Sequence, residues 1–382
     1  MHPSSIMSFY PTYSILDEIL STSENYDTLN IYIDLKNNLQ SLYMKHTIEN
    51  IVSATKLANG FCDTSIFTSV LSFLSFHKIY ASKRDIKINF FIFFESGESY
   101  YHKNISKKYK ISRKIDDLYG LDYKDRELFF EVLRANLTLI EKTLSHVPFT
   151  KVIRLHHMEA DFIPYYLITR NIVDTSPNIA HVVYSNDHDI YQTVRPNVFQ
   201  FSKAAKKKKI VKHGNVMFEF LKRKTNLSDD FLSLAMAVCG DPGDDVYGIK
   251  GIGPKTFSDI ALDLEKMVGG IPNLYNNVEK GKTIFDPSKV IKNKYINKVL
   301  ESESKDKLIS NNLKLVSFEL ISRFIENPST TEVLERKNKI LTNIAESNIV
   351  DKERMYKVLE MRKVYIQFDD LEVLYHGFEP GG

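Results

Sequence analysis

The sequence predicts an α/β protein, with a parallel sheet flanked by helices and a mostly helical second half. Residues 88–94 form a nearly continuous apolar run, which is typical of a strand buried on both faces of a parallel sheet. Other strand-like runs alternate with helical segments up to about residue 201, as in sheets built with right-handed crossovers. From about Ser202 the apolar spacing becomes that of helices.

The expected elements can be placed along the chain by their apolar spacing. Strands are predicted at residues 29–33, 88–94, 151–155, 181–184 and 197–201. Helices are predicted at residues 13–20, 65–80, 126–146, 215–224, 228–238 and 256–267, and over most of the chain from residue 306. A further helix is expected to open at residues 156–161 and to run through Thr169, because Pro164 is tolerated in a first turn.

Length and composition limit the possible classes of protein. The 382 residues allow two domains, and a net charge of +3 gives no overall basic field, so nucleic-acid binding would need local patches. No run approaches the ~20 apolar residues of a membrane helix, and the N-terminus does not resemble a signal peptide. Cys62 and Cys239 suggest neither a disulfide framework nor a zinc site. We therefore expect a reducing, cytoplasmic compartment and no membrane.

Acidic residues recur where the predicted strands end. In an open α/β sheet, ligands bind outside the carboxyl ends of the strands. Eight carboxylates lie at such positions or arrive from the second half of the chain: Asp34, Glu95, Glu159, Asp161, Asp187, Asp189, Asp241 and Asp244. Gathered in one crevice they would raise each other's pKa values, a repulsion that divalent cations remove.

Oxygen-only ligands favour Mg²⁺, with Mn²⁺ able to substitute. Two such ions, roughly 3.5–4 Å apart, can stabilise the attacking and leaving oxygens of a phosphodiester displacement. One ion also lowers the pKa of a bound water, so no protein nucleophile is required. Each acid alone could be an ordinary cap or loop residue, but eight at strand ends favour a metal centre.

Two stretches are basic. Residues 98–126 interleave lysines and arginines with tyrosines, which suits a single-stranded nucleic acid, although a solvated connection has the same composition. Residues 206–209 are four lysines, expected to form a basic loop, in which Lys207 and Lys208 contact phosphate or are simply solvated.

Residues 239–256 join two kinds of chemistry. Asp241 and Asp244 flank Gly243, which permits a tight turn. A glycine-rich turn follows and opens onto a helix, where backbone N–H groups bind phosphate readily. Its candidate phosphate-binding residues are Gly251, Gly253, Lys255 and Thr256.

This segment resembles the helix–three-turn–helix of the 5′-nuclease family, which includes flap endonucleases, the 5′-nuclease domain of DNA polymerase I and bacteriophage 5′-exonucleases and RNase H. The family pattern Gly-Asp-x-x-Asp-Asn, then Gly-Ile/Val-Gly-x-Lys-Thr, stands here at residues 240–245 and 251–256, with Asp245 replacing the usual Asn. Upstream, Asp34, Glu159-Ala160-Asp161 and Ser185-x-Asp187-x-Asp189 are similar to the family's acidic motifs. The resemblance covers about residues 29–270.

The resemblance implies a PIN-like nuclease domain at residues 29–201, after an extension at residues 1–28. Within it, residues 98–126 would form an arch or gateway over the active site. A helix–three-turn–helix DNA-binding domain would span residues 202–305, and a helical region residues 306–382. Two departures stand out: Glu95 replaces a usual aspartate, and Phe162 replaces a further aspartate of some members.

The resemblance also assigns roles in the gateway. Tyr109-Lys110-x-x-Arg113 is similar to the family's Tyr-Lys-x-x-Arg, so Lys110 and Arg113 would act catalytically by neutralising the scissile phosphate. Tyr109 would stack on a displaced base or be an ordinary core tyrosine, and Lys107 and Lys108 would contact DNA. Three histidines are expected at the surface or outside the metal ligands: His156, His157 and His188.

We therefore expect a monomeric, metal-dependent, structure-specific 5′-nuclease of replication or repair. Its partners would be branched or nicked duplex DNA and RNA–DNA hybrids, with replication proteins docking on the C-terminal region and a monovalent cation allowed at the glycine turn. One alternative is a non-catalytic nucleic-acid-binding protein that keeps the fold. Another is a single-strand ribonuclease of the smaller PIN type, against which residues 239–267 argue.

Overall fold

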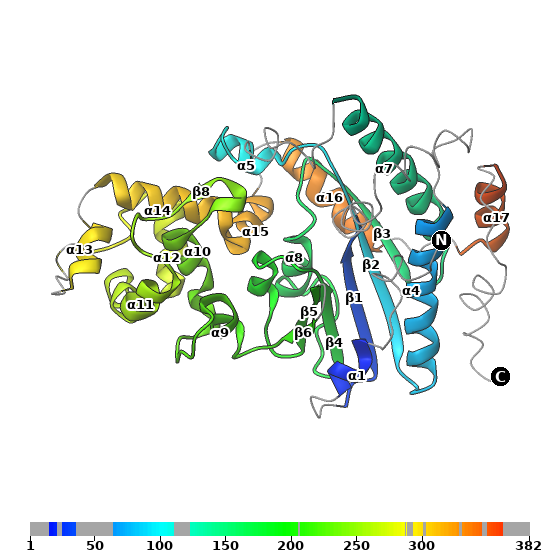
Figure 1. Cartoon of the computed structure of the whole chain (residues 1–382), viewed down its shortest axis with the longest axis horizontal. Helices are drawn as coiled ribbons and strands as arrows, with labels where there is room; N and C mark the ends of the chain where they lie inside the picture. The colour runs from blue at the N-terminus through cyan, green and yellow to red at the C-terminus, as the bar shows by residue number, and fades with distance from the viewer. Residues whose placement is uncertain are drawn as a thin grey trace.

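A computed structural model describes residues 15–20, 25–35, 64–110, 123–204, 207–286, 288, 293–300, 303–327, 331–345 and 350–361 (Figure 1). Its strands are β1 Thr28–Asp34, β2 Lys87–Ser96, β3 Thr150–His156, β4 Ile179–Tyr184, β5 Val198–Ala204, β6 Lys207–Val211, β7 Gly240–Asp241 and β8 Val246–Tyr247. The helices up to the glycine turn are α1 Ile15–Leu20, α4 Thr64–Ser82, α5 Tyr100–Ile105, α7 Tyr123–Leu144, α8 Ile163–Thr169, α9 Val216–Leu221 and α10 Leu232–Cys239. The later helices are α11 Pro254–Val268, α12 Ile271–Glu279, α13 Lys294–Leu300, α14 Glu303–Val316, α15 Phe318–Glu326, α16 Thr331–Ala345 and α17 Lys352–Met361. Three short 3₁₀ helices are η3 Asp189–Thr193, η4 Asp229–Phe231 and η5 Pro242–Asp244.

The main sheet has the strand order β3-β2-β1-β4-β5-β6. Strands β1 to β5 run parallel to one another, and only β6 is antiparallel, along β5. This arrangement confirms the predicted α/β class and the five predicted strands. Parallel pairing also brings the carboxyl ends of β1 to β4 to one edge of the sheet, since Asp34 is paired with Phe93 and Glu95 with Leu155.

Helices cover both faces of this sheet. Successive side chains of a strand point to opposite faces: Ile31 and Ile33 pack in a core with α1, α4 and α7, whereas Tyr32 packs in a core with α8, α15 and α16. The chain leaves the sheet for α9 to α14 and returns to it with α15 and α16 (Figure 1).

A separate core holds the helical lobe together, formed mainly by α9 to α14. Within α11 the buried residues Phe257, Ile260, Ala261 and Leu264 follow the spacing of one helix face. Pro254 occupies the first turn of α11, where its missing N–H costs no hydrogen bond. The helix after the glycine turn is thus where the sequence predicts it.

Two local predictions are wrong. Residues 207–211 form the edge strand β6 and not a loop, because Ile210 pairs with Phe201 of β5 and the strand is antiparallel along its length. Lysines are common on edge strands, where they discourage pairing with other chains. The helix expected from residues 156–161 begins only at Ile163, since Pro164 fits its first turn. The acids at positions 159 and 161 therefore lie in a loop.

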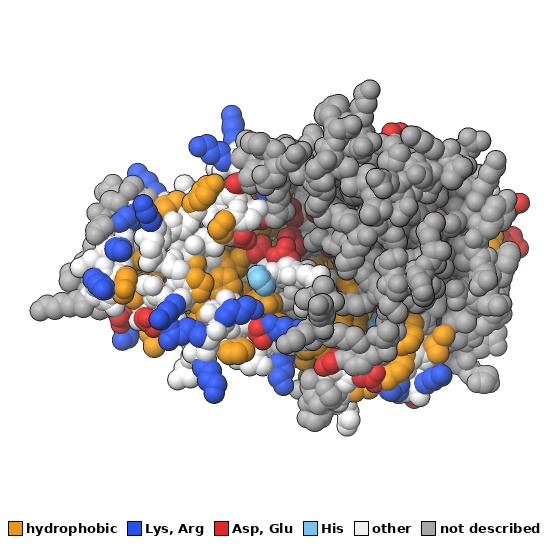
Figure 2. Space-filling view, viewed as in Figure 1, with side chains coloured by type: hydrophobic (Ala, Val, Ile, Leu, Met, Phe, Trp, Pro, Cys, Tyr) orange, Lys and Arg blue, Asp and Glu red, His pale blue; other side chains and the backbone are white. Residues whose placement is uncertain are grey.

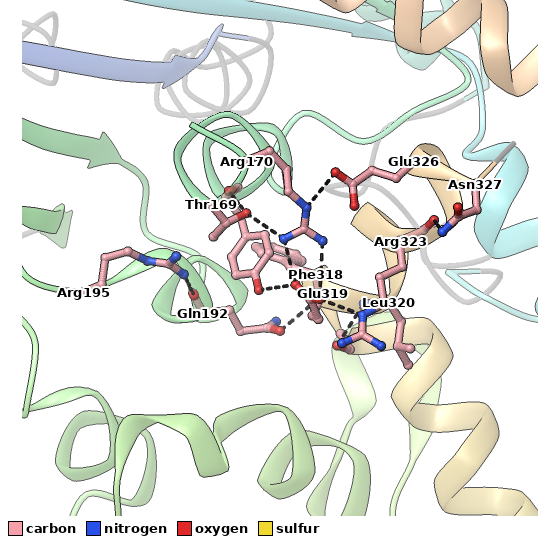
Figure 3. Close-up of polar contacts among 12 residues, drawn as sticks. Thr169, Arg170, Gln192, Arg195, Phe318, Glu319, Leu320, Arg323, Glu326 and Asn327 are labelled. Atoms are coloured by element: carbon pink, nitrogen blue, oxygen red, sulfur yellow. Dashed lines mark hydrogen bonds and ion pairs between the residues drawn. The ribbon is translucent and has the colours of Figure 1, made fainter. Parts of the chain in front are cut away.

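An ion network joins the sheet to the returning helix α15 (Figure 3). Glu319 of α15 accepts hydrogen bonds from Tyr165 (2.9 Å) and from both terminal nitrogens of Arg170 (3.1 and 3.3 Å). Arg323 donates to Glu319 (2.7 Å) and to Glu279 of α12 (2.8 Å). The Glu319 carboxylate thus links α8, which packs on the sheet, to the helical lobe.

We expect Glu319→Gln to lower the free energy of unfolding at pH 7 by about 1–3 kcal/mol, the usual worth of hydrogen bonds to a charged group. Burial alone would raise the pKa of Glu319, but hydrogen bonds from Arg323, Arg170 and Tyr165 lower it below its ordinary 4.5. Stability from a lowered carboxyl pKa is complete above pH 4.5 and is lost as pH falls further.

Urea unfolding of the Glu319→Gln variant at pH 7 and at pH 3 checks this. The deficit of the variant should shrink at pH 3, and exposed Glu335→Gln should match the wild type at both pH values. A deficit that stayed constant with pH would mean that the charge of Glu319 is not what stabilises the junction.

Candidate metal centre

Four of the predicted acids come from the carboxyl ends of β1, β2 and β3. Asp34 is the last residue of β1, and Glu95 is the last but one of β2. The Glu95 carboxylate accepts a hydrogen bond from the backbone N–H of Ala160 (3.1 Å), which ties the end of β2 to the loop carrying Glu159 and Asp161. The carboxylate of Glu95 thus contacts this loop.

The loop after β4 is fixed by its own polar contacts. Gln200 of β5 donates to the carbonyls of Ser185 (2.9 Å) and Asp187 (2.7 Å). The Asp187 carboxylate accepts from the N–H of Asp189 (3.1 Å), and the Ser185 hydroxyl accepts from the N–H of Asp187 (3.0 Å). These bonds set the direction of the Ser-x-Asp-x-Asp segment, and Asp189 ends buried.

The small hairpin of β7 and β8 brings the two acids of the helical lobe. Asp241 caps the turn by accepting from the N–H of Gly243 (3.0 Å), and the turn continues as η5 to Asp244. Asp189, Asp241 and Asp244 each place a carboxylate oxygen within 4.8 Å of the others. Residues 189 and 244 thus meet although they belong to the sheet and to the helical lobe.

Lys110 and Tyr109 bridge the same two parts. The Lys110 ammonium lies 2.7 Å from Glu159 and 3.2 Å from Asp244. The Tyr109 hydroxyl donates to Asp244 (2.8 Å) and lies 3.3 Å from Glu159. The backbone N–H of Lys110 also donates to the carbonyl of Asp244 (3.2 Å). The segment entering the proposed gateway is thereby fixed to both halves of the centre.

His102 is a site residue that the sequence analysis missed. Its buried ring stacks on Tyr109 with 4.3 Å between ring centroids, and its Nδ1 lies 3.9 Å from Glu159. Its other nitrogen is 3.0 Å from the carbonyl of Leu315, 213 residues away. Position 102 lies within the basic and aromatic stretch, but nothing local in the sequence distinguishes it from the neighbouring tyrosines.

The acids of the centre hold their charges unequally. Burial raises the pKa of Asp189, and the neighbouring Asp187 and Asp161 raise it further. Burial and the charge of Glu159 likewise raise the pKa of Asp161. Burial disfavours the charge of Lys110, yet Glu159, Asp161 and Asp244 raise its pKa above the ordinary value. The centre therefore carries an excess of negative charge that favours cations.

The residues fit a divalent metal. Asp161 and Asp189 each have one buried carboxylate oxygen, Oδ1, without a hydrogen-bond partner among the described residues. Buried carboxylate oxygens of this kind are costly unless a cation binds them. An all-oxygen donor set suits a hard cation such as Mg²⁺ or Mn²⁺. Figure 2 shows acidic side chains gathered at the inner edge of the helical lobe.

The remaining predicted residues are placed as follows. The ring of Tyr109 is buried, as expected for a core tyrosine, whereas its hydroxyl contacts the acids. Phe162 packs against Phe318 in the core of the sheet. Arg113 and the side chains of Lys207 and Lys208 lie outside the described residues. The exposed group comprises Lys107, Lys108, Gly251, Gly253, Lys255, His156, His157 and His188, while Thr256 is half-buried.

No protein-family model matches the chain. The chain is 30% identical to the 5′-3′ exonuclease of Mycoplasma pneumoniae over 170 residues, which are 43% of this chain and 53% of that protein. It is 28% identical to flap endonuclease Xni of Shewanella halifaxensis over 106 residues, which are 28% of this chain and 38% of that protein. The matches therefore span about half, or less, of the length of these relatives.

The fold is that of a phage 5′-exonuclease. The T5 5′-exonuclease with bound zinc matches with a TM-score of 0.52 and 18% identity over 88% of this chain and 99% of that chain. A T5 protein co-crystallised with metal ions matches with a TM-score of 0.54 and 19% identity, over 84% and 100% of the two chains.

The chain thus has the fold of these phage proteins, with an acidic centre where its sheet and its helical lobe meet. The resemblance to the 5′-nuclease family that the sequence motifs predict is confirmed by these relatives and by this fold. None of the described helices is both long enough and apolar enough to span a lipid bilayer.

Proposed function

We propose that the chain is a metal-dependent, structure-specific 5′-nuclease, which hydrolyses phosphodiester bonds at 5′ ends or flaps of duplex DNA and in RNA primers paired to DNA. One observation carries the proposal: carboxylates from the sheet and from the helical lobe lie together, beside Lys110. The names of its relatives, a 5′-3′ exonuclease and a flap endonuclease, support the same reaction class.

Two Mg²⁺ ions would be held by the eight acids named above, with Asp189, Asp241 and Asp244 as the best-defined set. Bound there, they would supply Lewis-acid stabilisation of the oxygens at the scissile phosphate and a water of lowered pKa. Lys110 would add a fixed positive charge beside that phosphate, and Tyr109 and His102 would hold Lys110 and Glu159 in place.

The glycine turn would bind the phosphates of the duplex away from the cut. Gly253 precedes the first turn of α11, a 15-residue helix whose N-terminal N–H groups suit an anion. Lys and Arg side chains are spread over the helical lobe (Figure 2). Binding through phosphates would be independent of sequence and weakened by salt.

For the domains, we propose a nuclease unit from residue 29 to about residue 211, where β6 completes the sheet, followed by the DNA-binding lobe. Docking of replication proteins on the C-terminal region, action as a monomer and a monovalent cation at the glycine turn stay predictions.

The test is product sizing on 5′-labelled flap, nicked and RNA–DNA hybrid substrates, with Mg²⁺ and with EDTA. We expect short 5′ products with Mg²⁺ and none with EDTA. Asp187→Ala and Asp241→Ala should abolish cleavage but keep DNA binding in Ca²⁺. Cleavage that survived EDTA or both substitutions would refute the proposal, and binding without cleavage by the wild type would favour the non-catalytic alternative.

A further inference from the structure

Tyr247 is an aromatic side chain that the packing of the protein leaves in solvent. Its relative exposure is 68%, the highest of the large hydrophobic residues that the structure describes as exposed. Single exposed apolar residues are common on protein surfaces. Tyr247 differs from such residues because its backbone is held by several contacts and because candidate nucleic-acid-binding residues lie on both sides of it in the sequence.

The backbone under Tyr247 is fixed from three sides. It pairs with Gly240 in the β7–β8 hairpin. Its carbonyl accepts a hydrogen bond (2.9 Å) from the buried amide of Asn312, which also donates to the carbonyl of Ala237 (2.8 Å). The next residue, Gly248, lies so close to Cys239 that a Cβ would approach that backbone to 2.2 Å. The backbone that carries the exposed ring is therefore held rigidly.

Along the chain, Tyr247 also lies between the two parts of the proposed nucleic-acid site. Asp244, a candidate metal ligand, precedes it by three residues, and Gly251 of the glycine turn follows it by four. Val246 points inward and is buried, so the alternation of the strand turns Tyr247 outward. The ring therefore projects from the same hairpin as Asp241, a few residues before the glycine turn.

We propose that Tyr247 is a stacking platform for an unpaired or terminal nucleobase of the bound strand, and that it positions the substrate between the metal centre and the glycine turn. Aromatic stacking on bases tolerates any sequence, because every base has a flat face. A ring on a rigid backbone loses little freedom when it binds. This inference rests on the proposed function and adds a base contact to its phosphate contacts.

The experiment measures the Kd of a fluorescent 5′-flap DNA in Ca²⁺, together with KM and kcat in Mg²⁺. Tyr247→Ala should raise Kd and KM about 5- to 100-fold, the range expected for one lost base stack, and should change kcat less. Tyr247→Phe should keep wild-type binding, and Tyr247→Leu should fall between them. Ile79→Ala, an exposed position on α4 at the sheet, is the control and should bind as the wild type does.

Salt dependence separates stacking from charge. Loss of a phosphate contact reduces the slope of log Kd against log salt by about 1, so Lys255→Ala should flatten the slope. Tyr247→Ala should weaken binding but should leave the slope of log Kd against log salt unchanged. Wild-type Kd in a folded Tyr247→Ala variant, or a Tyr247→Phe variant as weak as Tyr247→Ala, would overturn the inference. Failure of the wild type to cleave would instead refute the proposed function.

Discussion

Asp189→Asn should reduce the cleavage rate about 10³-fold at saturating DNA while it stabilises the metal-free protein. Asn keeps the shape of the side chain but removes one of three carboxylates that lie within 4.8 Å of one another. A metal at such a centre stabilises the transition state by several kcal/mol, and 1.36 kcal/mol is worth tenfold in rate. DNA binding in Ca²⁺ should be reduced far less than the rate.

Asp189→Asn should stabilise the metal-free protein although it lowers the rate, because burial, with Asp187 and Asp161, raises the pKa of Asp189 in the folded state. A carboxyl group with a raised pKa in the folded state lowers the free energy of unfolding at neutral pH, where it is charged, and not at acid pH, where it is protonated. Asp189→Asn should therefore gain about 0.5–2 kcal/mol at pH 7 in EDTA, a typical gain when functional strain is removed.

Thermal unfolding in EDTA at pH 7 and pH 4 measures this gain, which should shrink at pH 4. Asp230→Asn, an exposed acid before α10, is the matched control and should change neither rate nor stability. Wild-type cleavage by Asp189→Asn, or a loss of metal-free stability, would contradict the assignment of Asp189 to a metal centre.

Lys110→Ala should lower kcat about 10²–10³-fold, as loss of one fixed positive group beside a developing charge does. It should also destabilise the metal-free protein, because Glu159 and Asp244 would then face each other without the cation that lies 2.7 Å and 3.2 Å from them. Lys110→Arg should recover part of the activity, since the guanidinium keeps the charge but not the geometry of the ammonium.

Added Mg²⁺ should raise the Tm of Lys110→Ala more than that of the wild type, because the metal supplies the positive charge that the variant lacks. Lys107→Ala, an exposed lysine three residues earlier, serves as the control for general loss of charge. Equal Mg²⁺ effects on Lys110→Ala and on the wild type would show that Lys110 and the metal do not share these carboxylates.

Local patterns predict most of the fold. The apolar run of β2 and the helical spacing of α4, α7 and α11 are properties of short segments, so they can be read without the structure. The strand β6 could not be predicted in this way, because its lysines have no strand-like alternation and its pairing depends on β5. The start of α8 at Ile163 was predicted too early, because Glu159 and Asp161 fit a helical opening by composition.

That acids after β3 and β4 lie near one another could be expected, because parallel strands bring their carboxyl ends together. Asp241 and Asp244 come instead from the β7–η5 turn of the helical lobe. The partners of the acids could not be expected. His102 reaches Leu315 and Glu319 reaches Arg170 across 213 and 149 residues of sequence, and no local spacing predicts such contacts. Tyr109 shows the same limit, since only the packed structure shows a buried ring whose hydroxyl reaches Asp244.

Binding of Mn²⁺, followed by isothermal titration calorimetry and by electron paramagnetic resonance, tests most directly whether acids of the sheet and of the helical lobe form one metal centre. The wild type should bind Mn²⁺, and folded Asp189→Asn and Asp244→Asn variants, one from each part, should both lose the same site. Unchanged Mn²⁺ affinity and stoichiometry in either folded variant would contradict a centre shared by the two parts.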